Sequence, residues 1–251
     1  MISREVAATI TFATAIAAAP LEAQSGNPVA VVDAVRGSAI EAHIRYLASD
    51  LLEGRRPGTR GGELAAAYIA ASFARLGLEP AGDSGGYYHR VPIITLTPAP
   101  ELTVNGTALT WREDYVLWSM RIEPSVELSG GLVFAGYGIV APEAGWNDYA
   151  GLDVKGKTVI VLVNDPGLRD STLFKGKALT YYGRWTYKIE EAARQGAAGI
   201  LMVHTDESAT YGWSSVTGSW TGPQVRIETP ATSLIAAGWL REPAAASLFR
   251  G

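Results

Sequence analysis

The 251 residues suffice for one large domain or two smaller ones, and a content of 47% apolar and 18% charged residues predicts a folded core rather than a disordered chain. The formal net charge of −4, without any basic run, argues against a nucleic-acid-binding surface. The absence of cysteine excludes disulfides, thiolate catalysis and cysteine-ligated zinc or iron–sulfur sites.

The first residues carry the features of a secretory signal. Arg4 gives a sparse positive start, Val6–Ala19 is an alanine-rich apolar stretch, and the small Ala23 precedes a candidate cleavage point. We therefore predict a signal peptide over residues 1–23 and an exported protein, periplasmic or extracellular. The alternative interpretation is an ordinary N-terminal helix. The apolar run is too short to span a bilayer, so we expect no membrane association after its removal.

Two helices joined by an unusual loop are predicted next. Apolar residues at helical spacing indicate helices over Ser38–Ser49 and Gly61–Leu76. In the second helix the residues expected to face a core are Leu64, Ala67, Tyr68, Ala71 and Leu76. The loop Glu53–Thr59 places three charged groups among glycines and a proline, a combination typical of loops that contact another surface.

The chain then changes to short strands. Asn105-Gly106 is a tight-hairpin signal between two alternating runs, and Gly130-Gly131 predicts a bulge or bend inside an apolar strand. The predicted short strands are Tyr88–Thr95, Glu101–Leu109 and Asp114–Trp118, and the range Val126–Val140 contains the interrupted apolar strand.

A strand–helix–strand order follows. Lys157–Val163 and Ala198–Val203 are apolar runs typical of strands buried on both faces, and Tyr181–Gln195 is an amphipathic helix between them. This order predicts one βαβ unit beside an antiparallel sheet, and hence an α/β fold. Pro142–Asp153 is predicted to be a turn-rich connector, and Glu242–Arg250 is helix-like.

Several segments bear a resemblance to known proteins through their order and spacing. After the loop at Glu53–Thr59 and its helix come FAGYGIV, WNDY, DVKGK, VNDP and LTYYGRWTYKIEEAARQGAAG, which begin at Phe134, Trp146, Asp153, Val163 and Leu179. Together they resemble the exported bacterial aminopeptidases of metallopeptidase family 28, a di-zinc group.

The resemblance implies a two-part α/β architecture. Residues 24–95 would form the N-terminal helical segment of a zinc-aminopeptidase fold. Residues 96–251 would form an inserted protease-associated domain, a mixed β-sheet with a βαβ unit, and a trailing segment. The implied function is hydrolysis of peptides at a free N-terminus by the full-length enzyme with two zinc ions. The inserted domain would modulate substrate access, and the implied partner is a peptide substrate or a partner protein.

The chain differs from the family in its metal ligands. In the family these residues follow the inserted domain, and this chain carries no such set. We therefore expect no catalytic residue, no zinc site and no peptidase activity in this chain alone. The alternative is a stand-alone peptide-binding or protein-binding module of protease-associated type. A third hypothesis is a hydrolase that uses His204 and Asp206.

His204 and Asp206 have the H-x-D spacing with which the family opens its metal site. No histidine follows them, and the adjacent pair Glu190-Glu191 lies earlier, on a helix. We interpret them as a loop feature at a strand end and reject them as metal ligands.

Four residues are candidates for positions near a substrate. Glu53, Arg55 and Arg56 either pair and cap within their own loop or form a rim that approaches the catalytic half. Arg184, before the helix of the βαβ unit, is either a buried hydrogen-bonding anchor or a substrate contact.

Trp213 and Trp220 lie in a stretch rich in serine, threonine and glycine. They either line a peptide or sugar surface or cover the edge of the sheet.

Overall fold

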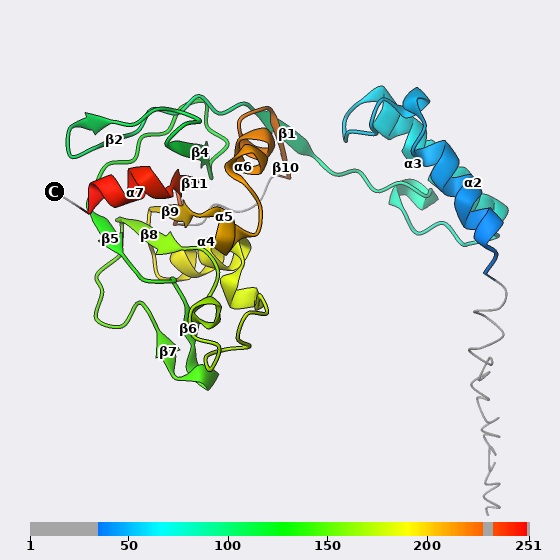
Figure 1. The fold of residues 1–251 in the computed structure, drawn as a ribbon. Coiled ribbons are helices and arrows are strands. Elements are labelled where there is room, and N and C mark those ends of the chain that lie inside the picture. Colours follow the sequence, from blue (N-terminus) through cyan, green and yellow to red (C-terminus); the bar gives the residue numbers. More distant parts are fainter. Residues whose placement is uncertain (1–34, 228–232, 250–251) are drawn as a thin grey trace, which may run out of the picture. The chain divides into compact units, whose positions relative to one another are not determined.

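A computed structural model describes residues 35–227 and 233–249, and the predicted signal peptide lies outside these ranges. The chain divides into two compact units, residues 1–72 and 73–251 (Figure 1). The predicted boundary at residue 95 stays a prediction. No helix among the residues described is long and apolar enough to cross a membrane.

The smaller unit contains the two expected helices. α2 runs over Gly37–Leu47, a short helical turn, η1, over Asp50–Leu52, and α3 over Arg60–Arg75, which continues past the unit boundary. Tyr46 and Tyr68 hold the helices together with ring centroids 4.3 Å apart, and the Tyr68 hydroxyl is 2.8 Å from Nδ1 of His43. Both helices are confirmed to within one or two residues.

The buried face of α3 differs from the expected one. Gly61, Ala65 and Ala70 are buried, whereas Ala67, Ala71 and Leu76 are exposed. The reason is the contact at Gly61, where an added Cβ would lie 1.7 Å from the Leu52 carbonyl oxygen. This contact turns the glycine and alanine side of the helix inward.

The larger unit begins with small ribbons. After η2 (Asp83–Gly85), β1 (Ile93–Leu96) pairs antiparallel with β10 (Gln224–Ile227). The predicted hairpin is confirmed: β2 (Thr103–Val104) and β3 (Thr107–Ala108) pair across Asn105-Gly106, whose φ angles are +50° and +78°.

A five-stranded mixed sheet forms the centre of the larger unit. Its order is β4 (Tyr115–Ser119), β11 (Ala236–Arg241), β9 (Gly199–His204), β8 (Thr158–Leu162) and β5 (Leu132–Phe134). All strands are parallel except β4. α4 (Trp185–Arg194), preceded by η5 (Tyr181–Gly183), joins β8 to β9, which confirms the βαβ unit.

Two strand predictions take a more specific form in the structure. The mixed sheet with a βαβ unit is confirmed, and its antiparallel part is the edge strand β4, which pairs with β11. Within Val126–Val140, where a strand interrupted at Gly130-Gly131 was expected, β5 forms after these glycines and Gly136 follows it. The chain then turns into the ribbon of β6 (Val140–Ala141) and β7 (Trp146–Asn147) around η3 (Pro142–Ala144).

Helices cover both faces of this sheet (Figure 1). α4 and α6 (Trp213–Trp220) pack on one face, and α7 (Glu242–Leu248), the predicted last helix, packs on the other. Alternate strand residues supply the two cores: Val159, Val161, Ile200, Met202 and Trp239 on the first, and Ile160, Leu201, Val203 and Leu240 on the second. Trp220 stacks on Trp118 of the edge strand β4 at 4.0 Å, as expected for a tryptophan that covers the sheet edge.

Candidate functional site

The loop Glu53–Thr59 forms an exposed turn in the smaller unit. Glu53 and Arg55 adopt left-handed backbone conformations, with φ angles of +52° and +57°. The Arg55 N–H donates to the Leu52 carbonyl at 2.8 Å, and the Thr59 hydroxyl donates to the Arg56 carbonyl at 2.7 Å. Glu53 forms an ion pair with Arg60 at 3.1 Å. These contacts correspond to the first of the two roles considered for the loop, in which its residues pair and cap locally.

Glu53→Gln is expected to change the free energy of unfolding by less than about 0.5 kcal/mol, because the Glu53–Arg60 pair is exposed at both ends. The measurement is thermal unfolding followed by circular dichroism, with Glu63→Gln in the first turn of α3 as a matched control. A loss several times larger in Glu53→Gln alone would show that the loop depends on this charge.

Arg184 is exposed at the N-cap position of α4, so it is not the buried anchor considered from the sequence. Its backbone N–H donates to the Tyr181 carbonyl at 3.1 Å, and its carbonyl accepts from the Lys188 N–H at 3.3 Å. Arg184 lies in the larger unit and Glu53, Arg55 and Arg56 in the smaller one, so these candidates do not share one compact unit.

His204 is the last residue of β9 and is almost fully buried, whereas Asp206 is exposed in the first turn of α5 (Asp206–Ala209). Nε2 of His204 is 3.0 Å from the Tyr211 carbonyl, and Nδ1 is 3.8 Å from a carboxylate oxygen of Asp206. Burial lowers the pKa of His204. The imidazole lies among the rings of Tyr211, Trp213 and Trp239 and is part of the core.

The described residues do not fit a zinc pair. Within residues 35–227 and 233–249, no three histidine, aspartate or glutamate side chains come close enough together to hold a metal ion. No chemical step through zinc can be derived from these residues.

The segments that resemble the peptidase family meet at one edge of the mixed sheet. The carboxyl ends of parallel strands share an edge, so β5 delivers Gly136 and Tyr137 beside Asn164 and Asp165 from β8. α4 begins at the same edge and contributes Tyr187 and Lys188. We call Tyr137, Asp148, Asp165, Tyr187 and Lys188 the edge cluster.

Asp148 fixes the loop after β5. One carboxylate oxygen accepts the Ile139 N–H at 3.0 Å, and the Asp148 N–H donates to the Ile139 carbonyl at 2.8 Å. Gly136 has a φ angle of +50°, and a Cβ there would lie 2.7 Å from the Asp148 carboxylate. This close approach explains why glycine is required at position 136.

Asp165 fixes the loop after β8 from a fully buried position. One oxygen accepts the Gly167 N–H at 3.0 Å, and the other accepts the Thr180 hydroxyl at 2.5 Å. Asn164 precedes it with a φ angle of +73° and donates from Nδ2 to the Ser208 carbonyl at 3.0 Å. The two residues thus tie the loop to the start of α4 and to the segment after β9.

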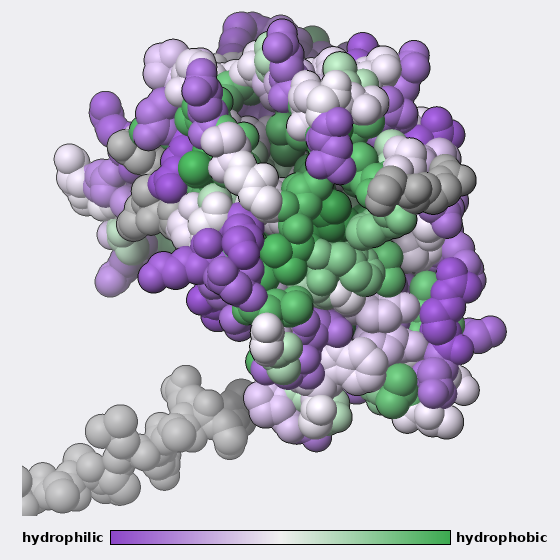
Figure 2. All heavy atoms as spheres, turned by 90° about the vertical axis from the view of Figure 1, so that its left-hand side faces the viewer, coloured by the Kyte–Doolittle hydropathy of each residue, from purple (hydrophilic) through white to green (hydrophobic). Residues whose placement is uncertain are grey.

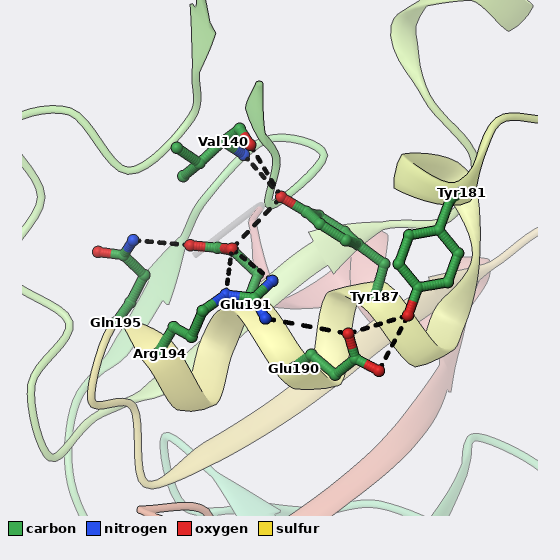
Figure 3. Close-up of polar contacts among 7 residues, drawn as sticks. All are labelled: Val140, Tyr181, Tyr187, Glu190, Glu191, Arg194 and Gln195. Carbon is green, nitrogen blue, oxygen red and sulfur yellow. Dashed lines mark hydrogen bonds and ion pairs between the residues drawn. The ribbon is translucent and has the colours of Figure 1, made fainter. Parts of the chain in front are cut away.

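Tyr187 fastens α4 to β6 (Figure 3). Its hydroxyl lies 3.1 Å from the Val140 nitrogen and 3.0 Å from the Val140 carbonyl oxygen, so it accepts from one group and donates to the other. Glu191, one helical turn later, is 3.3 Å from the same hydroxyl and also accepts from Arg194 and Gln195. Burial raises the pKa of Tyr187, which keeps the phenol protonated as a donor.

Tyr187→Phe is expected to destabilise the larger unit by about 1 to 2 kcal/mol, because the Val140 N–H loses its acceptor in a largely buried place. Tyr181→Phe is the matched control, since the Tyr181 hydroxyl bonds Glu190 on the exposed side of the same helix. Urea unfolding measures both, and equal losses in the two variants would contradict a special role for Tyr187.

Lys188 is the central cation of the edge cluster. Its side chain is fully buried and its Nζ has no hydrogen-bond partner within the part of the chain that the structure describes. Nζ lies 5.9 Å from the Tyr137 ring centroid and 6.0 Å from that of Tyr187. Burial lowers the pKa of Lys188 to about 7, although the charges of Asp148 and Asp165 act in the opposite direction.

Sequence reasoning missed Lys188. The available signal was a lysine between Trp185 and Ala192, one turn from each, on the apolar side of the predicted helix. Such a lysine is buried only when carboxylates or rings lie nearby. The cluster holds the loops after β5 and β8 in fixed positions.

The comparisons with known proteins find distant structural similarity and no family. No family model matches the chain, and none of the curated proteins matches it. Among solved structures it is similar to an aminopeptidase from Aneurinibacillus sp. strain AM-1, with 18% identity and a TM-score of 0.36. The alignment covers 85% of this chain and 41% of that one. This similarity is too distant to assign a family or an activity.

Proposed function

We propose that the chain is the N-terminal, non-catalytic portion of an exported zinc aminopeptidase. In this proposal the larger unit is a protease-associated domain that controls which peptides reach a zinc-bearing half outside these 251 residues. The peptide substrate belongs to the full-length enzyme, and this chain alone hydrolyses nothing.

One observation carries the proposal. The segments that resemble the peptidase family lie far apart in the sequence, and parts of four of them meet in the edge cluster. Asp148, Asp165 and Lys188 come from three different segments, and the charges of both carboxylates act on the buried Lys188. Their convergence supports the interpretation that these segments are parts of one structural unit.

A second candidate is a stand-alone module that binds a peptide or a partner protein. The observation that favours it is an open groove of about 1190 Å³ at the amino ends of the parallel strands, lined in part by the end of α7. Its lining includes the exposed apolar side chains Leu132, Phe134 and Phe249. Exposed apolar areas on folded proteins often mark sites that bind another molecule.

Zinc titration by calorimetry and an aminoacyl-nitroanilide assay test the first candidate. The 251-residue protein is expected to show neither two-site zinc binding nor turnover, and both together would contradict the proposal. The coding DNA after residue 251 separates the two candidates. An open frame with an H-x-D motif and a Glu-Glu pair supports the enzyme, and a stop codon with stable folded expression supports the module.

A further inference from the structure

The groove lies away from the edge cluster, toward the amino ends of the parallel strands. Thr158, Gly199 and Ala236, which begin β8, β9 and β11, contribute to its lining. The segment from Leu96 to Asn105 and the segment from Glu123 to Gly131 form its sides. Figure 2 shows the side of the molecule on which β5 lies, with an apolar area at its centre and hydrophilic side chains around it.

β5 borders the groove as an open edge strand. The Thr158 N–H donates to the Gly131 carbonyl and the Ala135 N–H donates to the Ile160 carbonyl, both at 3.0 Å. Since alternate residues of a strand face the same neighbour, Leu132 and Phe134 direct their N–H and C=O groups away from β8. No other strand pairs with β5 in the described residues. This edge can accept one more strand.

The side chains beside this edge are apolar. Leu132 is 39% and Phe134 46% exposed, and the Phe134 ring meets that of Phe249 edge-to-face at 5.4 Å. A strand added to β5 would place alternate side chains against these rings.

The charges of the groove are unbalanced. Among the described residues that line it, Glu101, Glu123 and Glu127 carry negative charge and Arg226 is the one cation. The three glutamates are exposed, and none of them forms an ion pair with another described residue. A ligand that carries positive charge would complement this lining.

We propose that this groove binds extended peptides in which apolar residues alternate with lysine or arginine, and that the peptide pairs as a strand with the open edge of β5. The inference rests on the peptide-recognition role proposed above and specifies the peptide class. Backbone pairing at Leu132 and Phe134 supplies affinity for any extended peptide, and the glutamates select the cationic ones.

Fluorescence polarisation with labelled peptides tests the proposal. One probe alternates valine and lysine over about eight residues, a length that a single strand spans, and the other alternates valine and glutamate. The 251-residue protein is expected to bind the lysine peptide about tenfold or more tightly than the glutamate peptide. Added salt is expected to reduce this difference.

Two variants locate the binding site. Leu132→Pro removes an outward N–H without removing a bond to β8, and Phe134→Ala removes an apolar contact; each is expected to weaken binding of the lysine peptide about tenfold. Leu152→Ala is the control, because Leu152 is 38% exposed and does not line the groove. Tryptophan emission verifies that each variant is folded.

Three results would overturn the proposal: equal affinity for the two peptides, no binding of either, or unchanged binding in both groove variants. A protein that dimerises through β5, seen as a dimer in sedimentation that Leu132→Pro abolishes, would assign the edge to a second copy instead. These readouts are independent of zinc binding and peptidase activity, so failure here is distinguishable from failure of the proposed enzyme lineage.

Discussion

Asp165→Ala is expected to lower the free energy of unfolding of the larger unit by about 4 kcal/mol. The carboxylate is fully buried and accepts from the Gly167 N–H and from the hydroxyl and N–H of Thr180. Hydrogen bonds to a charged group contribute about 1.5 to 3 kcal/mol each, and their buried donors would lose their partner. The substitution also removes one of the two negative charges that act on Lys188.

Urea unfolding followed by tryptophan fluorescence measures this loss. All seven tryptophans lie at or after position 111, so the signal reports on the larger unit alone. Asp170→Ala is the matched control, because Asp170 accepts from the N–H and hydroxyl of Thr172 with similar geometry in an exposed turn. We expect a much smaller loss there. Similar losses at both positions would show that burial of Asp165 is not what makes it important.

The stability of the larger unit is expected to rise by about 2 kcal/mol between pH 7 and pH 9, and Lys188→Met is expected to remove most of this rise. The folded-state pKa of Lys188 is about 7, below the ordinary value of 10.5. Between these two values the unfolded chain binds more protons than the folded one, so the free energy of unfolding increases with pH. Methionine fills a similar volume and does not titrate.

The pH window ends near 9 for a physical reason. Burial raises the pKa of Tyr137, Tyr149 and Tyr211, so above pH 10 the unfolded chain loses phenolic protons that the folded one keeps. That effect lowers stability as the pH rises and would mask the lysine. The measurement is the free energy of urea unfolding as a function of pH, for the wild type and for Lys188→Met. The same pH dependence in both proteins would contradict a buried Lys188 with a lowered pKa.

The sequence predicted the elements whose side chains repeat a clear pattern. β8 and β9 follow from apolar runs, α4 from its amphipathic spacing, and the β2–β3 hairpin from Asn105-Gly106. β11 was missed because it opens with Ala236, Ala237 and Gly238, which give no strand signal. The fold explains the glycine, since a Cβ at position 238 would lie 2.3 Å from the Val116 carbonyl oxygen of the neighbouring strand.

The candidate site was less accessible from the sequence. The motifs around Asp165 and Tyr187 were recognised as a resemblance, but their meeting point depends on strand order, which periodicity does not give. Lys188 remained hidden because a lysine in a helix is usually exposed. The open edge of β5 could not be predicted, because the sequence does not show that this strand has three residues and pairs with β8 alone among the described strands.

We propose above that this chain recognises peptides and does not cleave them. The test is a calorimetric titration of the 251-residue protein with the valine–lysine peptide, carried out with and without zinc. The peptide is then recovered and its mass is measured by mass spectrometry. We expect the same binding isotherm in both conditions and an intact peptide. Zinc-dependent binding with loss of the N-terminal residue would contradict it.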